Sequence, residues 1–150
     1  MHAGSGFLTR TVRIASDHGD MSITHLNPPH MHKSPAFSQG TIVPAGSRIL
    51  YVGGQNGVGA DGKVVGNTIQ AQTEQALRNV LAVLAAAGAS QTDVAKMNIH
   101  IIEGTDVNAG FGASLAVWGA NPTAITVLSV PSFANPDFLV EIDAIAALPA

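Results

Sequence analysis

Residues 67–102 read NTIQAQTEQALRNVLAVLAAAGASQTDVAKMNIHII and hold the clearest structural signal of the chain. An amphipathic helix is predicted here, because apolar side chains recur at helical spacing at positions 69, 76, 80, 83 and 87. Asn67, with Gln70 three residues later, resembles a capping box, and Gly88 suits the end of the helix. Residues 94–102 are rich in β-branched and long apolar side chains, which predicts a strand.

Two short strands are predicted upstream of the helix. Residues 41–44 and 48–53 are separated by the turn residues Ala45-Gly46-Ser47, which indicates a β-hairpin. The glycine-rich residues 57–62 lack the lysine of a phosphate-binding loop, so we expect an ordinary connection there. The proline-rich residues 28–35 predict an extended arm that leads into the domain.

A shorter helix and two further strands are predicted downstream. Residues 106–118 have helical character, although Gly110 and Gly112 each cost about 1 kcal/mol relative to alanine in a helix interior. Residues 124–130 and 138–147 are predicted strands. The expected order is therefore β-β-α-β-α-β-β. This is an α/β (α+β) fold in which two helices cover one face of a mixed sheet.

The chain is expected to form one domain over residues 21–150 that associates with copies of itself. Charged residues make up only 11% of the sequence, against a typical share of about a quarter. No apolar run is long enough to span a membrane, so the excess apolar surface predicts subunit contacts. Met21 resembles a natural start, and residues 1–20 lack the apolar core of a signal peptide. We therefore expect them to be an N-terminal extension or a remnant of cloning.

Composition also excludes several classes of function. The absence of cysteine removes thiolate catalysis, disulfides and cysteine-bound zinc, and it is typical of a cytoplasmic protein. A formal charge of −3 with seven basic residues provides no patch for a nucleic-acid backbone. His30 and His32 lack a third ligand for zinc, so no metal and no cofactor is expected. Neither a membrane nor a nucleic acid is an expected partner.

Six short segments, taken in order, resemble a known family. Together they extend over about residues 34–147 and are similar to RidA proteins, also called YjgF or enamine/imine deaminases, some of which carry an older endoribonuclease L-PSP label. Each segment is a weak signal alone, but six in the same order make chance unlikely as an explanation. The segments are SPAFSQ at 34–39, VGGQ at 52–55, the helix at 72–88, DVAK at 93–96, NPTA at 121–124 and VEIDAIA at 140–146.

The resemblance implies a chorismate-mutase-like fold, a homotrimer and a small-molecule cleft at each subunit interface. Catalytic members hydrolyse reactive enamines or imines to keto acids and ammonia, and the glutamate that positions or activates water falls on Glu141. Ligand-contacting positions fall on Phe37, in place of a frequent tyrosine, and on Thr126. Gln55 and Trp118 are candidates for the cleft walls. The residues alone leave alternatives open, because Glu141 also fits a solvated strand acid and Trp118 a core aromatic.

Ala124 is the main departure from the family pattern, because it falls on the position of the arginine that holds the substrate carboxylate. A guanidinium binds a carboxylate through a planar two-pronged fork, and alanine has no equivalent. Loss of such a buried partner typically costs several kcal/mol. No Lys or Arg follows Lys96, so a replacement is expected only from Arg48, Lys33 or an adjoining subunit.

Two functions therefore remain open. The first is hydrolysis of an enamine or imine less acidic than 2-aminoacrylate, with Glu141 as the base and Thr126 and Gln55 orienting the substrate. The second is a non-catalytic ligand-binding or regulatory trimer that lost deaminase activity, which the residues Ala124 and Phe37 favour. His100, among isoleucines, is expected to be structural rather than a general base. An endoribonuclease is the least favoured function, because the chain is acidic.

Overall fold

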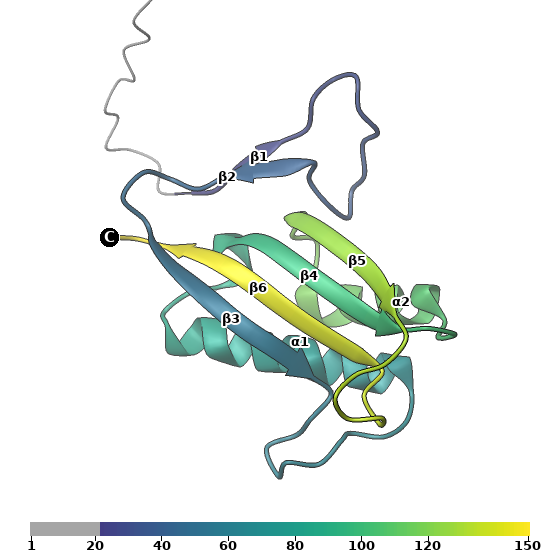
Figure 1. The fold of residues 1–150 in the computed structure, drawn as a ribbon. Helices are drawn as coiled ribbons and strands as arrows, with labels where there is room; N and C mark the ends of the chain where they lie inside the picture. The colour runs from purple at the N-terminus through teal and green to yellow at the C-terminus, as the bar shows by residue number, and fades with distance from the viewer. Residues whose placement is uncertain (1–21) are drawn as a thin grey trace, which may run out of the picture.

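A four-stranded mixed sheet forms the centre of the molecule, in the order β3-β6-β4-β5 (Figure 1). The structure is a computed structural model that describes residues 22–150, so the expected extension at 1–20 lies outside the described residues. β6 runs antiparallel to both β3 and β4, whereas β4 and β5 are parallel. The four strands are β3 (Arg48–Asn56), β4 (Val94–Ile102), β5 (Ala124–Val130) and β6 (Val140–Leu148).

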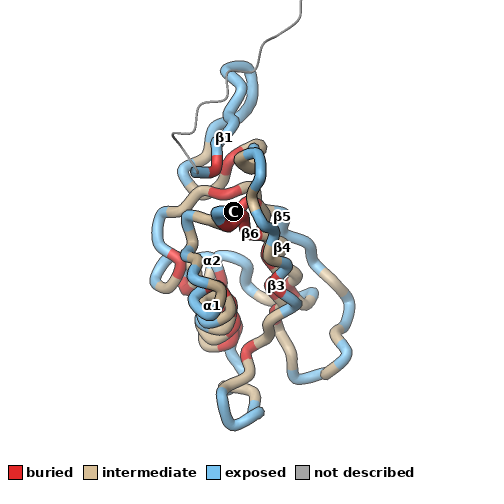
Figure 2. The backbone as a smooth tube through the Cα atoms, turned by 90° about the vertical axis from the view of Figure 1, so that its left-hand side faces the viewer, coloured by how far each residue is buried: buried red, intermediate tan, exposed pale blue. Residues whose placement is uncertain are grey.

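Two helices, α1 (Ile69–Ala86) and α2 (Val107–Trp118), cover one face of this sheet (Figures 1 and 2). We call this side the helix face and the other side the open face. The mixed sheet with two helices on one face is the predicted fold, with one additional strand upstream. The hydrophobic core lies between α1 and the sheet, where its largest fully buried apolar side chains are Leu77, Leu84, Met97, Ile142, Val80, Val94 and Val140.

The predicted cap of the first helix is wrong by one residue. Thr68 rather than Asn67 is the N-cap, because Thr68 has an extended backbone and its side chain accepts a hydrogen bond from the amide of Ala71. The end of the helix agrees with the prediction, since Gly88 has a φ of 75°, a left-handed conformation that favours glycine. A single 3₁₀ turn, η1 (Gln91–Asp93), leads into β4.

The predicted β-hairpin at 41–44 and 48–53 is also wrong. Strand β2 (Gly40–Ile42) instead pairs antiparallel with β1 (Thr24–Leu26), a three-residue strand that the sequence did not reveal. A turn does follow at Gly46, with the amide of Ser47 donating to the Pro44 carbonyl at 3.3 Å, but the chain then enters the main sheet. The Thr41 hydroxyl donates to the Ala95 carbonyl at 2.7 Å, which fixes the small β1–β2 sheet over the start of β4.

Gln72 ties α1 to the segment before β6. Its side chain is fully buried, and its amide nitrogen donates to the carbonyls of Gly66 and Asp137 at 3.0 and 2.9 Å. Its amide oxygen accepts from the backbone N–H of Leu139 at 2.9 Å. This one side chain therefore sets how the 131–139 connection enters β6.

The open face is more polar than the helix face. Along β6 the buried residues Val140, Ile142 and Ala144 alternate with the half-exposed Glu141 and Asp143. Because successive strand residues point to opposite faces, the two acids lie on the open face. Asp143 accepts a hydrogen bond from the Asn98 side-chain amide on β4 at 2.8 Å.

Candidate functional site

Glu141 lies at one end of the open face, where its carboxylate borders Asn56 and Gly54. Its Oε2 accepts a hydrogen bond at 3.3 Å from the side-chain amide of Asn56, which also donates to the Val140 carbonyl at 2.9 Å. The other carboxylate oxygen lies directly over Gly54: a Cβ on that residue would be only 2.4 Å from Oε1. Gly54 of the VGGQ segment therefore leaves the space that the Glu141 side chain occupies, and a side chain at this position would displace it.

Two polar side chains of α1 support this arrangement. Asn79 donates through its side-chain amide to the carbonyls of Asn56 and Val58, at 3.1 and 2.9 Å. Gln75 donates in turn to the Asn79 side-chain oxygen at 2.9 Å. The helix thus holds the end of β3 that carries the Asn56 contact to Glu141. Neither Asn56 nor Asn79 was predicted from the sequence. The available signal was that each is a polar residue in a strand or helix whose neighbouring residues are mostly apolar.

His100 is the register partner of Glu141 across the β4–β6 pair, so the two side chains lie on the same face. The Nδ1 atom of His100 is buried and has no hydrogen-bond partner in the part of the chain that the structure describes. Gln55 lies next to this end of the sheet, where its side-chain amide donates to the Gly53 carbonyl of its own strand at 3.1 Å. Glu141 and His100 therefore lie together at one end of the open face, whereas Gln55, the register partner of the buried Ile142, belongs to the opposite face of the sheet.

Ala124 lies toward the opposite end of that face, and Thr126 lies between Ala124 and the level of Glu141. They are the register partners of Lys96 and Asn98, and the Lys96 ammonium donates a short hydrogen bond to the Thr126 hydroxyl. A cation therefore does stand beside the alanine, on the neighbouring strand. Sequence reasoning considered only cations outside this strand, because the parallel pairing of β4 with β5 is not visible in the sequence.

The other two cations considered lie elsewhere. Arg48 is exposed at the start of β3, where its Nε donates to the Pro149 carbonyl at 3.1 Å, and Lys33 is exposed in the arm before β2. Among the described residues, Lys96 is the cation that shares a face and a register position with Ala124. Its single ammonium provides one point charge, whereas an arginine would provide a planar fork.

The two ends of the open face are too far apart to act on one small molecule within a single chain. On β4, the partner of Ala124 is Lys96 and the partner of Glu141 is His100, four residues further along. At about 3.3 Å per residue, this separation is about 13 Å. A site that uses both ends needs a second copy of the chain.

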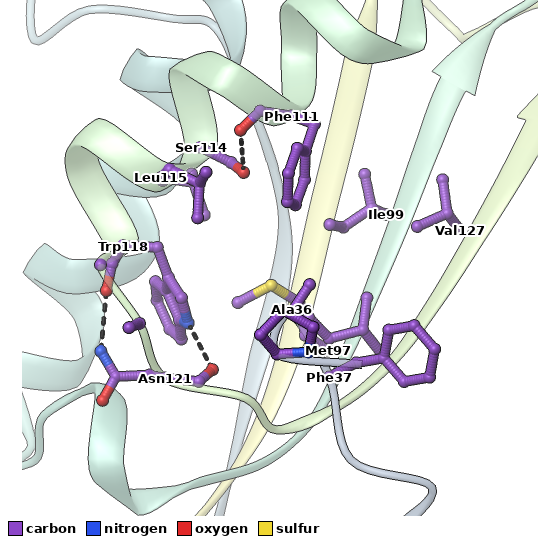
Figure 3. Close-up of a pocket in the computed structure, with 15 residues that line it drawn as sticks. Ala36, Phe37, Met97, Ile99, Phe111, Ser114, Leu115, Trp118, Asn121 and Val127 are labelled. Atoms are coloured by element: carbon purple, nitrogen blue, oxygen red, sulfur yellow. Dashed lines mark hydrogen bonds between the residues drawn. The ribbon is translucent and has the colours of Figure 1, made fainter. Parts of the chain in front are cut away.

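Phe37 and Trp118 lie together on the helix face. They line a cavity of about 700 Å³ between α2 and the strands β4 and β5 (Figure 3). The indole nitrogen of Trp118 donates to the Asn121 carbonyl at 3.4 Å, and the Asn121 side-chain amide donates back to the Trp118 carbonyl at 2.8 Å. Within one chain these two aromatic residues therefore lie on the opposite face of the sheet from Glu141, so a cleft that joins all three, as predicted, needs a second copy of the chain.

The comparison with known proteins agrees with this fold and with the order of its segments. The family model described as Endoribonuclease L-PSP matches residues 31–148, nearly the whole described chain. The chain belongs to the Rid (YjgF) family. A Rid-family protein of unknown function from Yersinia pestis is 32% identical, with a TM-score of 0.76; the match covers 85% of this chain and all of that one.

Two other solved structures extend the Rid comparison. A member of the YjgF/YER057c/UK114 family from Mycobacterium tuberculosis is 26% identical, with a TM-score of 0.56, over 75% of this chain and 86% of that chain. RidA from an Antarctic Psychrobacter shares the fold, at 23% identity and a TM-score of 0.62, over 77% of this chain and 97% of that chain. No curated protein matches the chain.

Nowhere in residues 22–150 do three His, Cys, Asp or Glu side chains group as they would around a metal ion. In the same range, neither helix is long and apolar enough to cross a membrane.

Proposed function

We propose that this Rid protein is a cytoplasmic homotrimer that hydrolyses an enamine or imine less acidic than 2-aminoacrylate in a cleft between subunits. In this proposal Glu141 of one copy faces Ala124, Thr126 and Lys96 of a neighbour. The observation that carries it is the carboxylate of Glu141, held by Asn56 over Gly54 on a face that no helix covers.

Glu141 is the proposed general base of the reaction. It takes a proton from water as the water oxygen bonds to the C=N carbon, which gives a carbinolamine. The imine nitrogen is protonated at the start, so this carbinolamine is neutral, and the carboxyl group returns the proton to its nitrogen. The carboxylate then takes the hydroxyl proton as the carbonyl forms and the C–N bond breaks, ammonia leaves, and the proton on Glu141 passes to water, which restores the base. Neither a cofactor nor a metal is needed for this sequence of steps.

The substrate class follows from the opposite end of the face. A carboxylate bound by arginine receives two parallel hydrogen bonds, whereas Lys96 offers one charge that already donates to Thr126. We therefore expect Lys96 and Thr126 to orient a carbonyl, hydroxyl or weakly acidic group. A fully charged carboxylate should bind less well than in relatives with the arginine.

Ammonia release from enzymatically generated imines tests this proposal, with a neutral and a carboxylated substrate compared side by side. We expect the wild type to prefer the neutral substrate. Ala124→Arg should raise kcat/KM for the carboxylated substrate by about a hundredfold, because a buried charged pair is worth several kcal/mol. Ala124→Leu is the matched control that adds bulk without charge. Equal activity of Ala124→Arg and Ala124→Leu on the carboxylated substrate would contradict the assigned role of this position.

A second candidate function is a non-catalytic trimer that binds a small molecule. Ala124 and Phe37 favour it, because each lacks a polar group that catalytic relatives carry at that position. The same assay distinguishes the two functions: if neither the wild type nor Ala124→Arg releases ammonia above the rate in buffer, the binding function is the one to pursue.

A further inference from the structure

We propose that the cavity between α2 and the strands β4 and β5 is a binding site for an uncharged, ring-bearing small molecule. Its volume of about 700 Å³ lies within the range of about 300–1,000 Å³ that is typical of small-molecule sites. Side chains from α2 form one wall and side chains from the strands form the other, with Phe37 at the edge (Figure 3).

The space exists because α2 packs on α1 rather than on the strands beneath it. Gly110 is buried at this helix contact, and a Cβ there would lie only 3.3 Å from the Ile69 side chain. The close approach through Gly110 draws α2 toward α1. On the other side of α2, the small side chain of Ser114 does not fill the distance to β5.

The cavity reaches the core and is open at its mouth. Leu77 and Met97 in its lining are each 1% exposed, and Trp118 is 5% exposed. Phe111 and Leu115, which also line it, are 49% and 48% exposed. A flat surface of another protein would cover Phe111 and Leu115 but would not reach the buried lining residues. A small molecule inside the cavity can contact both the exposed and the buried residues.

The chemistry of the lining selects against charge. No Asp, Glu, Lys, Arg or His contributes to it, and its polar side chains already have partners. The Ser114 hydroxyl donates to the Phe111 carbonyl at 2.7 Å, and Asn121 and Trp118 bind each other. A charged ligand would lose its hydration without gaining a counter-ion. An uncharged ring would bury apolar surface against aromatic and aliphatic side chains.

This inference does not depend on imine hydrolysis. The cavity lies on the helix face, whereas Glu141 lies on the open face, so either site can exist without the other. The chain also contains its own probe, because Trp118 is its only tryptophan. The single indole N–H signal in a ¹H–¹⁵N NMR spectrum of the full-length protein therefore reports on this cavity alone.

The experiment is a titration of that signal with acetophenone, an uncharged ring compound, and with benzoate, which has a similar size and a charge. We expect a saturable shift with acetophenone and binding of benzoate that is weaker by about a hundredfold, because an unpaired carboxylate is costly to bury. A shift that grows linearly with both compounds would overturn the proposal.

Ser114→Phe fills the cavity and should weaken acetophenone binding by about tenfold or more. Ala85→Phe adds the same ring to an exposed position of α1 and should leave binding unchanged. Equal affinity of both variants would count against the site. If Ser114→Phe does not fold, crystals of the wild type under xenon give an independent answer, because xenon enters empty apolar cavities. Xenon between Trp118 and Met97 supports the site, and a neighbouring subunit's side chain found there overturns it.

Discussion

The two faces of the β3-β6-β4-β5 sheet differ in how complete they are within one chain. The helix face closes over an apolar core, and the walls of its cavity come from α2, β4 and β5, with an open mouth. The open face carries the ionisable groups, but Glu141 and Lys96 stand at opposite ends of it. One face is therefore built for folding and for apolar contacts. The other has the parts of a reactive site, which a second copy must bring together.

The largest expected effect comes from removing the proposed general base on the open face. Glu141→Gln removes the proposed general base while it keeps the shape of the side chain and a partner for Asn56. We expect kcat for ammonia release to fall by about 10²–10⁴-fold, the usual contribution of a positioned base. Glu74→Gln makes the same chemical change on α1, away from this face, and should retain full activity. An unchanged rate in Glu141→Gln would remove Glu141 from the mechanism.

The next largest effect concerns the helix face and is measured as a change in the free energy of unfolding. Gln72→Leu leaves the Leu139 N–H and the carbonyls of Gly66 and Asp137 without the partner that this buried side chain provides. Since these hydrogen bonds are part-buried and an unsatisfied buried group costs about 1–3 kcal/mol, we expect the free energy of unfolding to fall by about 1–3 kcal/mol. Gln70→Leu, at an exposed position two residues earlier on α1, is the matched control. Urea denaturation of both variants measures the difference, and equal midpoints would show that the buried network contributes little.

A smaller effect is expected from a substitution next to Glu141 on the open face. Gly54→Ala places a methyl group where the Glu141 carboxylate lies, so the carboxylate must move. We expect kcat/KM to fall by about tenfold, since even a small misplacement of a reacting group is costly. Gly53→Ala meets no atom within 4 Å and should have little effect. If the two alanine variants have the same activity, the exact position of the carboxylate does not matter to the reaction.

Much of the fold was predictable from the sequence because its signals are local. The β-branched run at 94–102 and the segment at 124–130 are strands with the predicted bounds, and Asp106 caps a helix that ends at Trp118 as expected. The hairpin was mispredicted because a turn between two apolar segments does not show which strand each one pairs with. β1 was missed because three residues are too few for a period-2 pattern.

The candidate site was predictable only in part, because it depends on pairing across strands. The resemblance indicated Glu141 and Ala124, but the placement of Lys96 beside Ala124 requires the register of β4 with β5. The Asn56 and Asn79 contacts join segments that are more than 20 positions apart in the sequence. Phe37 and Trp118 were expected in one cleft with Glu141, and because they lie on the helix face of one chain, such a cleft stays a prediction that needs a second copy.

The central claim is that a working site joins Glu141 of one copy to Lys96 of another. Its most direct test mixes two inactive variants, Glu141→Gln and Lys96→Met, by unfolding and refolding them together. Random assortment leaves about a quarter of the shared sites with both natural residues, so ammonia release should return to about a quarter of the wild-type rate. If the mixture is no more active than the separate variants, Glu141 and Lys96 do not share a site between copies.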